Sequence, residues 1–217
     1  MTYGLEVERA TVRYGTFTAV DEVSLSVAPG EILALQGESG SGKSSLLRGI
    51  AGLEPLASGS IRWNGTDLTH TPTHLRGFVL MFQDGQLFPH LDVAGNIAYG
   101  ISQLPRRERE ARTAELLVLV GLEGYGKRRI TELSGGQAQR VALARSLAPQ
   151  PRMLLLDEPL SSLDKGLRER LVGELGTIIR GSGTASIYVT HDEDEAFTLA
   201  DRVGVLKDGR LLRVTTA

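Results

Sequence analysis

The chain has 217 residues, no cysteine and a formal net charge of −2. A chain of this length forms one domain with a sizeable core, and the lack of cysteine excludes disulfides, thiolate metal sites and cysteine nucleophiles. The mildly acidic balance gives no electrostatic reason to expect nucleic acid, whose binding usually demands a concentrated basic surface, so we expect no nucleic acid as a partner. No apolar run approaches the ~18 residues of a membrane span, and the mixed N-terminus does not resemble a signal peptide.

The first part of the chain alternates apolar and polar residues as β-strands do. The segments "LEVERATVRY" (5–14) and "VSLSV" (23–27) have the period of strands with one buried face. The segment "GSIRWNG" (59–65) predicts another strand, and its Asn64-Gly65 dipeptide is typical of tight hairpin turns. These segments predict an antiparallel β-subdomain near the N-terminus.

A glycine- and serine-rich segment, "GESGSGKSS" (37–45), interrupts this pattern. It follows a predicted buried strand at 32–35 and precedes "SSLLRGIAGL" (44–53), which predicts a short helix. Glycine disfavours both helix and strand interiors, so the alternatives are a flexible linker, an ordinary turn and a phosphate-binding loop. A linker would not lie between a strand and a helix that follow so closely. The spacing of Gly37, Gly42 and Lys43 matches G-x-x-x-x-G-K-[ST] and favours the phosphate loop.

In such a loop, backbone N–H groups and the following helix N-terminus face the phosphates. Lys43 would then contact the β- and γ-phosphates, and the Ser44 hydroxyl would contact Mg²⁺. The expected nucleotide-binding residues of the loop are Gly37, Glu38, Ser39, Gly40, Ser41, Gly42, Lys43, Ser44 and Ser45.

Two adjacent acids follow a short apolar run in "MLLLDEP" (153–159). They could mark a strand that turns into solvent. In a chain with a phosphate loop, acids at the carboxyl end of a parallel strand more often hold metal and catalyse. We expect Asp157 to hold Mg²⁺ through water and Glu158 to polarise the attacking water as a general base.

The remaining chain alternates strands and helices. Residues 84–150 are mainly helical in pattern, with the clearest helix in "RREREARTAELLVLVGL" ending at Gly121. The other predicted elements are strands at 78–83, 153–157 and 185–191, a helix at 164–180, and a hairpin of 202–207 with 210–214 about Asp208-Gly209. Buried strands alternating with helices predict a mainly parallel sheet with helices on both faces. We therefore expect a single α/β domain over 1–217 with a P-loop (RecA-like) core. The β-subdomain and the core should occupy about 1–83 and 151–217, and an inserted helical subdomain should occupy about 84–150.

The segment "LSGGQ" (133–137) precedes an amphipathic helix. Ser134 could simply be a helix N-cap. The same arrangement also makes a second anion site at a helix N-terminus, which a head-to-tail pair of chains could use together with the phosphate loop.

Six motifs in order give the chain a resemblance to the ATP-binding subunit of an ABC transporter, over nearly its whole length. They are the Walker A loop "GESGSGKSS", Gln83 in "MFQD", "LSGGQ", the Walker B segment "LLLDEP", the D-loop "SSLD" and the H-loop "THD".

The resemblance implies further roles in a homodimer or paired ATPase. Gln83 would sense Mg²⁺ and the attacking water, and His191 would contact the γ-phosphate as a catalytic residue. Ser134, Gly135, Gly136 and Gln137 would contact the γ-phosphate bound to the opposite subunit, and Asp164 would link the two sites. Tyr14 occupies the place of the aromatic ring that stacks on adenine in this family. The alternative for Tyr14 is a strand tyrosine with a solvent-exposed hydroxyl.

The segment "FQDGQLFPHLDVAGNIAYG" (82–100) carries an apolar cluster that could pack inward. In the family this segment receives a cytoplasmic helix of a membrane subunit. Its sequence is similar to that of the ATP-binding subunits of importers of thiamine, ferric iron and polyamines. The resemblance therefore implies ATP-driven import of a small polar solute or ion. It implies transmembrane permease subunits and an extracytoplasmic solute-binding protein as partners, and a peripheral location at the cytoplasmic face of the membrane. The alternatives are an exporter or lipoprotein-releasing system and a soluble ABC protein. We expect no C-terminal regulatory domain, because the chain stops soon after the final hairpin.

Overall fold

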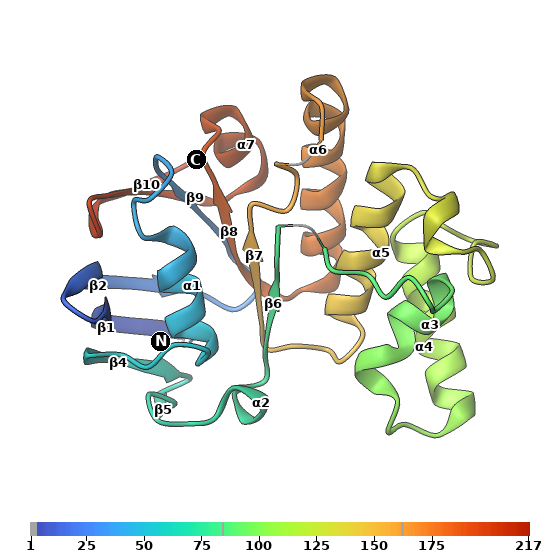
Figure 1. Ribbon diagram of the computed structural model, residues 1–217, viewed down its shortest axis with the longest axis horizontal. Coiled ribbons are helices and arrows are strands. Elements are labelled where there is room, and N and C mark those ends of the chain that lie inside the picture. Colours follow the sequence, from blue (N-terminus) through green and yellow to red (C-terminus); the bar gives the residue numbers. More distant parts are fainter. Residues whose placement is uncertain (1–3, 84, 162) are drawn as a thin grey trace.

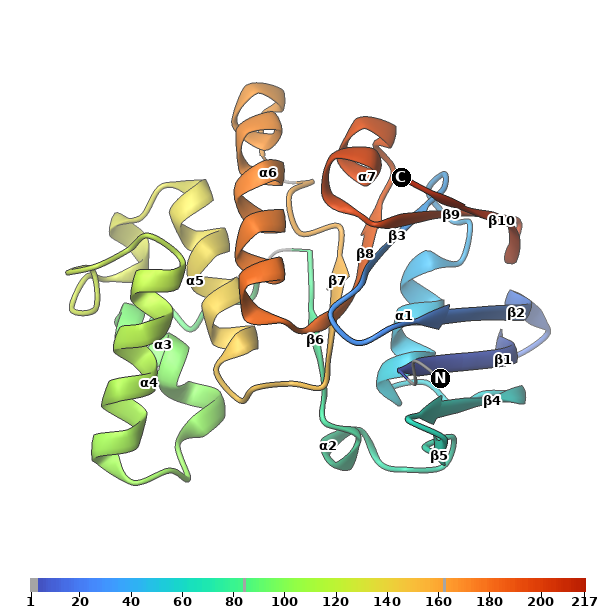
Figure 2. The same cartoon turned by 180° about the vertical axis from the view of Figure 1, so that it is seen from behind.

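The computed structural model describes residues 4–83, 85–161 and 163–217, and two β-sheets form its framework. A four-stranded sheet has the strand order β2-β1-β4-β5, and a six-stranded sheet has the order β10-β9-β3-β8-β7-β6. Helix α1 (Lys43–Ala51) lies between the two sheets, and the longer helices lie on the other side of the larger sheet (Figure 1). Figure 2 shows the same layers from behind.

The smaller sheet is antiparallel and comprises β1 (Leu5–Tyr14), β2 (Phe17–Val27), β4 (Ser58–Trp63) and β5 (Thr66–Asp67). Its apolar face packs against α1, and together with one face of the larger sheet they form one buried hydrophobic cluster. The turn between β4 and β5 has positive φ at Asn64 (49°) and Gly65 (77°), as a two-residue hairpin turn requires.

The larger sheet comprises five parallel strands, β3 (Ile32–Gln36), β6 (Phe78–Met81), β7 (Met153–Asp157), β8 (Ala185–Thr190) and β9 (Arg202–Lys207), with β10 (Arg210–Thr216) antiparallel at its edge. Both faces of its central strands are buried. In β3, Leu33 and Leu35 face α1 and the smaller sheet, whereas Ile32 and Ala34 face the other helices. Burial on both faces explains why these strands are continuous apolar runs in the sequence.

The second core lies between the larger sheet and the helices α3 (Val93–Ala98), α4 (Arg106–Leu119), α5 (Gly135–Leu147), α6 (Lys165–Ser182) and α7 (Glu193–Leu199). Helix α5 contacts β6 and α6 on one side and α3 and α4 on the other. One apolar cluster therefore runs from the sheet to the outer helices. Within the described ranges, no helix is both long enough and apolar enough to cross a membrane.

Most predicted elements are present, with small differences. Strand β2 begins at Phe17 rather than at residue 23, the helix predicted at 164–180 is α6, and helix α2 (Thr73–Arg76) and α7 were not predicted. Helix α7 has only seven residues and an acidic first turn capped by Asp192, so it lacks a clear apolar period. The division into a helical subdomain of residues 84–150 stays a prediction. Its first residue, Asp84, and Ser162 of the "SSLD" motif lie outside the described residues.

Candidate functional site

The candidate site lies where the central parallel strands end. Strand β3 ends at Gln36, β7 at Asp157 and β8 at Thr190. Gln36 pairs with Thr190 and Asp157 pairs with Val189, so these strand ends lie at one edge of the sheet. The glycine-rich loop follows β3, the acidic pair ends β7, and His191 follows β8. Ligands commonly bind at this edge of parallel sheets.

Backbone contacts from both sheets fix the shape of the loop. A Cβ added to Gly42, which has φ +100°, would lie 2.3 Å from the carbonyl oxygen of Ala19 in β2. A Cβ added to Gly37 would lie 2.3 Å from the carbonyl oxygen of Leu206 in β9. Only glycine fits at these two positions, because a side chain would displace the backbone of a neighbouring strand.

The turn between β9 and β10 joins the loop to the smaller sheet. The Gly209 N–H donates to the Ser41 carbonyl oxygen at 3.1 Å, and the Gly209 carbonyl oxygen accepts from the Asp21 N–H at 2.8 Å. Arg210 and Asp21 reinforce this link with an ion pair. The phosphate-loop geometry thus depends on three segments that are distant in sequence.

Lys43 is the first residue of α1 and is almost fully buried. Its Nζ donates to the carbonyl oxygens of Gly37 (2.7 Å) and Glu38 (2.8 Å) and lies 3.8 Å from Glu158 Oε1. Burial lowers the pKa of Lys43, and the nearby carboxylates of Glu158 and Asp157 oppose that shift. The ammonium group is therefore held at a fixed place at the start of a helix, where the backbone also favours an anion.

Asp157 and Ser44 provide the oxygen atoms expected of a magnesium site. The Ser44 hydroxyl donates to Asp157 Oδ1 at 2.8 Å, and the Asp157 side chain is buried. Burial raises the pKa of the Asp157 carboxyl, and the hydrogen bond from Ser44 opposes the shift. Within the described ranges, no cluster of three or more His, Asp or Glu residues could cage a metal. One carboxylate and one hydroxyl fit Mg²⁺, which usually keeps waters and phosphate oxygens as its other ligands.

The loop also contains a buried hydroxyl that lacks a partner. Among the described residues, Ser41 Oγ has no hydrogen-bond partner although Ser41 is only 6% exposed. Buried polar atoms are nearly always hydrogen-bonded in native proteins. The unsatisfied hydroxyl therefore suits a loop that surrounds a polar ligand.

Glu158 and His191 form a second pair at the site. His191 Nδ1 lies 3.1 Å from Glu158 Oε2, and the two side chains are 49% and 22% exposed. Glu158 has a positive φ of 46°, a conformation that costs free energy for a residue with a side chain. Such strained residues cluster at functional sites. The carboxylate is held between the Lys43 ammonium and the imidazole while remaining accessible to solvent.

Two cavities flank the loop. A cavity of about 850 Å³ is lined by Gln36 to Ser41 together with Glu158 and His191. A second cavity of about 460 Å³ is lined by Lys43 to Ser45, Asp157, Glu158, Gln83 and Tyr14. The structure therefore brings Gln83 and Tyr14 to the same cavity as the loop and both acids, and it leaves Tyr14 39% exposed.

The "LSGGQ" residues lie elsewhere. Ser134 is the N-cap of α5 and forms a reciprocal capping box with Gln137. A Cβ on Gly135 or Gly136 would lie 2.9 Å from the side chain of Leu163 or Leu171, so both glycines allow close packing against α6 and the loop before it. None of residues 134–137 is among those that line the two cavities. Within one chain, a helix N-cap is enough to explain the arrangement of residues 134–137.

Asp164 has a similar place. It is the N-cap of α6 and accepts a hydrogen bond from the Leu167 N–H at 3.1 Å. It does not line either cavity. Its predicted role between two sites stays a prediction.

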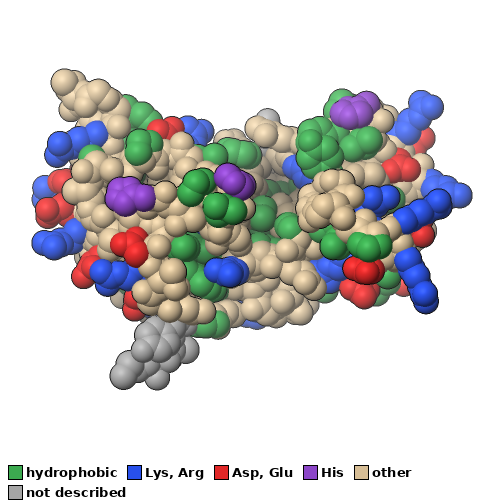
Figure 3. Space-filling view, turned by 90° about the horizontal axis from the view of Figure 1, so that it is seen from below, with side chains coloured by type: hydrophobic (Ala, Val, Ile, Leu, Met, Phe, Trp, Pro, Cys, Tyr) green, Lys and Arg blue, Asp and Glu red, His purple; other side chains and the backbone are tan. Residues whose placement is uncertain are grey.

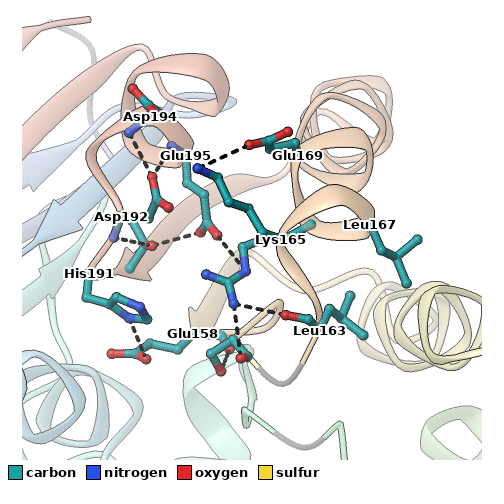
Figure 4. A network of polar contacts seen from close by, with 12 residues as sticks. Glu158, Leu163, Lys165, Leu167, Glu169, His191, Asp192, Asp194 and Glu195 are labelled. Carbon is teal, nitrogen blue, oxygen red and sulfur yellow. Dashed lines mark hydrogen bonds and ion pairs between the residues drawn. The ribbon is translucent and has the colours of Figure 1, made fainter.

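Sequence reasoning missed two features. Phe17 is 63% exposed and lines the smaller cavity with Tyr14, its cross-strand partner. The "YGTF" spacing around a tight turn could have indicated this aromatic pair. The second feature is an ion pair between Arg168 and Glu195. Glu195 also bonds the Thr190 hydroxyl next to His191, and Figure 4 shows it near Glu158 and His191.

Comparisons with known proteins agree with the motifs. The family model described as "ABC transporter" matches residues 20–161. An Fe(3+) ions import ATP-binding protein of Streptomyces coelicolor is 54% identical over 214 residues, which are 98% of this chain and 62% of that protein. A spermidine/putrescine import ATP-binding protein of Roseobacter denitrificans is 46% identical over 215 residues, or 98% of this chain and 59% of that protein. The chain thus spans about 60% of the length of these relatives.

A solved structure shows the same fold. The structure of CbiO1 from Clostridium perfringens, described as part of the ABC transporter complex CbiONQ, superposes with a TM-score of 0.91 at 29% sequence identity. The match covers 100% of this chain and 89% of that chain. The predicted fold class, a P-loop NTPase with an antiparallel N-terminal sheet and a mainly parallel sheet with helices, is confirmed.

Proposed function

This chain belongs to the ABC transporter family, and from that membership we propose that it binds ATP with Mg²⁺ and hydrolyses it to drive import through separate membrane subunits. The observation that carries the proposal is the convergence of Lys43, the Ser44–Asp157 pair and the Glu158–His191 pair around one glycine-rich loop. Phosphate binding, metal binding and proton transfer need these groups within a few ångströms of one another.

Each group has a chemical role suited to its place. Lys43 and the amides of the loop hold the β- and γ-phosphates, and the Tyr14 ring supports the adenine. Ser44 and Asp157 hold Mg²⁺, with Gln83 nearby, and the ion supplies charge stabilisation at the transferring phosphate. Glu158 accepts a proton from the attacking water. His191 orients the Glu158 carboxylate and contacts the γ-phosphate.

The active form would be a head-to-tail dimer. In one chain the loop surrounds the phosphates from one side only, and the second anion site, at the N-terminus of α5, does not line the cavities. In a dimer, each ATP would lie between the loop of one subunit and Ser134, Gly135 and Gly136 of the other. Binding of ATP then brings the subunits together, and hydrolysis by Glu158 separates them.

The surface for the membrane subunits would lie on the helical side of the molecule. The Phe88 and Tyr99 rings are in contact, tilted by 41° with centroids 4.4 Å apart, and Tyr99 is 57% exposed. Asn96 holds the segment by bonding both the N–H and the carbonyl oxygen of Phe88. Seen from below, the part of the molecule that contains α3 to α5 has hydrophobic side chains at its surface (Figure 3).

The names of both curated relatives support import over export, since each is an import ATP-binding protein, one for Fe(3+) ions and one for spermidine and putrescine. We infer a small polar solute or ion as cargo, an extracytoplasmic solute-binding protein, and a location at the cytoplasmic face of the membrane through permease subunits.

The direct test is nucleotide binding and turnover by the purified chain. Mg²⁺-dependent release of phosphate from ATP is expected, and Lys43→Ala should abolish nucleotide binding because it removes the one buried cation at the loop. An exposed lysine substitution, Lys127→Ala, serves as the matched control and should bind as the parent does. A parent chain that binds no ATP would refute the proposal.

A further inference from the structure

An ion pair outside the cavities lies between the two loops that carry the candidate catalytic residues. Arg168 in α6 and Glu195 in α7 approach to 3.7 Å between Nε and Oε1, and their side chains are 19% and 8% exposed. Neither residue is among those that line the two cavities beside the phosphate loop. Arg168 bonds the Leu163 carbonyl oxygen in the loop after Glu158, and Glu195 bonds the Thr190 hydroxyl next to His191. Figure 4 shows Glu195 and Leu163 close to Glu158 and His191.

Glu195 fixes the backbone around His191. Its Oε2 accepts hydrogen bonds from the Tyr188 hydroxyl (2.9 Å) and the Thr190 hydroxyl (2.7 Å). The same Thr190 hydroxyl accepts from the Asp192 N–H at 3.0 Å. Burial and the neighbouring Glu195 carboxylate raise the pKa of Tyr188, so its hydroxyl stays protonated and donates. The carboxylate thus holds the residues on both sides of His191.

Arg168 fixes the loop that follows Glu158. Its Nη2 donates to the carbonyl oxygens of Leu163 (2.9 Å) and Ser161 (3.4 Å). Ser161 is itself bonded to Glu158, since its N–H and hydroxyl both donate to the Glu158 carbonyl oxygen, at 3.2 and 2.8 Å. The guanidinium is therefore two hydrogen bonds away from the backbone of Glu158.

These contacts form a closed ring. It runs from Glu158 through Ser161, Arg168, Glu195 and Thr190 to His191, and the 3.1 Å contact between His191 Nδ1 and Glu158 Oε2 closes it. We propose that Arg168 and Glu195 are positioning residues for ATP hydrolysis, which hold the Glu158 loop and the His191 loop in one relative arrangement. This inference rests on the proposed ATPase function. Removal of the pair should let the two loops shift independently without disturbing the phosphate loop.

The test compares turnover with nucleotide affinity. In Glu195→Gln, kcat should fall by roughly 10- to 100-fold, since displacements of about 1 Å at reacting groups have effects of this size. ATP affinity should equal that of the parent, because Lys43 and the loop are untouched. The double variant Arg168→Met/Glu195→Gln should lose no more turnover than the worse single variant, since residues of one network are non-additive.

The same helix provides a matched control. Lys165 and Glu169 form an ion pair at 3.9 Å, also drawn in Figure 4, whose side chains are 87% and 67% exposed. Glu169→Gln makes the same chemical change as Glu195→Gln without contact to either loop, and its kcat should equal the parent value.

The outcomes separate the two proposals. A parent without ATPase activity refutes the proposed function. An active parent with equal kcat in Glu195→Gln and Glu169→Gln refutes the positioning role, as does a Glu195→Gln variant that loses ATP affinity in proportion to turnover. If Glu195→Gln does not fold, the double variant carries the test, because it leaves no buried charge unpaired. Its kcat should then be reduced, and a parent-like kcat refutes the positioning role.

Discussion

The Ser44 hydroxyl donates a 2.8 Å hydrogen bond to the Asp157 carboxylate, although 113 positions separate the two residues. The contact joins the first turn of α1 to the end of β7 and gathers two oxygen ligands beside Lys43. If the pair holds Mg²⁺, chelation by EDTA should abolish ATP hydrolysis, and excess Mg²⁺ should restore it. Ser44→Ala should raise the Mg²⁺ concentration needed for half-maximal turnover, whereas Ser60→Ala on the smaller sheet should not. Turnover that is insensitive to EDTA would contradict the assignment.

The Asp157 carboxyl should make stability depend on pH. Burial raises its pKa above the ordinary 3.8, so the folded chain keeps this proton to a higher pH than the unfolded chain does. The contribution of the group to folding is therefore fully present below pH 3.8 and is lost as pH rises through the raised pKa. Asp157→Asn stays neutral, and without Mg²⁺ it should be more stable than the parent at pH 8 by on the order of 1 kcal/mol. Urea unfolding at pH 8 and pH 4 measures this gain, which should shrink at the lower pH. A variant less stable than the parent at pH 8 would show that contacts in the folded chain offset the free-energy cost of burying the Asp157 carboxylate.

Glu158 should be essential for turnover but not for binding. Glu158→Gln keeps the size of the side chain and removes the base, so hydrolysis should slow by about 10²–10⁴-fold. ATP affinity should remain, because Lys43 keeps its bonds to the Gly37 and Glu38 carbonyl oxygens. Phosphate release and equilibrium binding measure the two quantities. Glu123→Gln, an exposed change on the helical side, is the control, and equal turnover by Glu158→Gln and the parent would exclude the base role.

The "LSGGQ" segment should matter only between two chains. The Glu158→Gln variant should be monomeric alone and dimeric with ATP, as light scattering after size exclusion can show. Addition of Ser134→Arg should keep it monomeric by blocking the second anion site. Ser102→Arg is the control, since it makes the same change at an exposed serine outside the segment and should leave ATP-dependent dimerisation intact. Equal dimerisation by the arginine double variant would mean that the segment is only a helix cap.

The Phe88–Tyr99 aromatic pair should be needed for partner binding. Leu87 packs against the second core, between the larger sheet and the helices. Its replacement would lower the stability of the chain, so a loss of partner binding would have two causes. The double variant Phe88→Ser/Tyr99→Ser should hydrolyse ATP as the isolated parent does. In the assembled system it should no longer associate with the membrane subunits or support transport. Leu212→Ser changes an exposed leucine on β10 and should leave assembly intact.

The sequence predicted those parts of the site that are local. The glycine-rich loop is contiguous, and its Gly37 and Gly42 mark backbone positions where a side chain would meet a neighbouring strand. The buried strands were equally clear, because central parallel strands have apolar residues on both faces.

The parts that were not predicted depend on tertiary contacts. Nothing near Arg168 or Glu195 distinguishes them from the other charges of α6 and α7, and α7 itself is too short to show a period. Phe17 gains its place at the cavity only through pairing with Tyr14 across the hairpin. The positive φ of Glu158 likewise occurs where its N–H donates a hydrogen bond to the Val189 carbonyl oxygen of β8, a contact between segments distant in sequence.

The link from Ser41 through Gly209 to Asp21 has a consequence for dynamics. The glycine-rich loop shares a backbone hydrogen bond with the β9–β10 turn, and this turn shares one with β2 of the smaller sheet. Local opening of either segment would therefore deform the loop, and a ligand held by the loop must oppose that opening by mass action. Occupancy of the site should accordingly slow hydrogen exchange at the amides of Asp21 and Gly209, which contact no phosphate themselves.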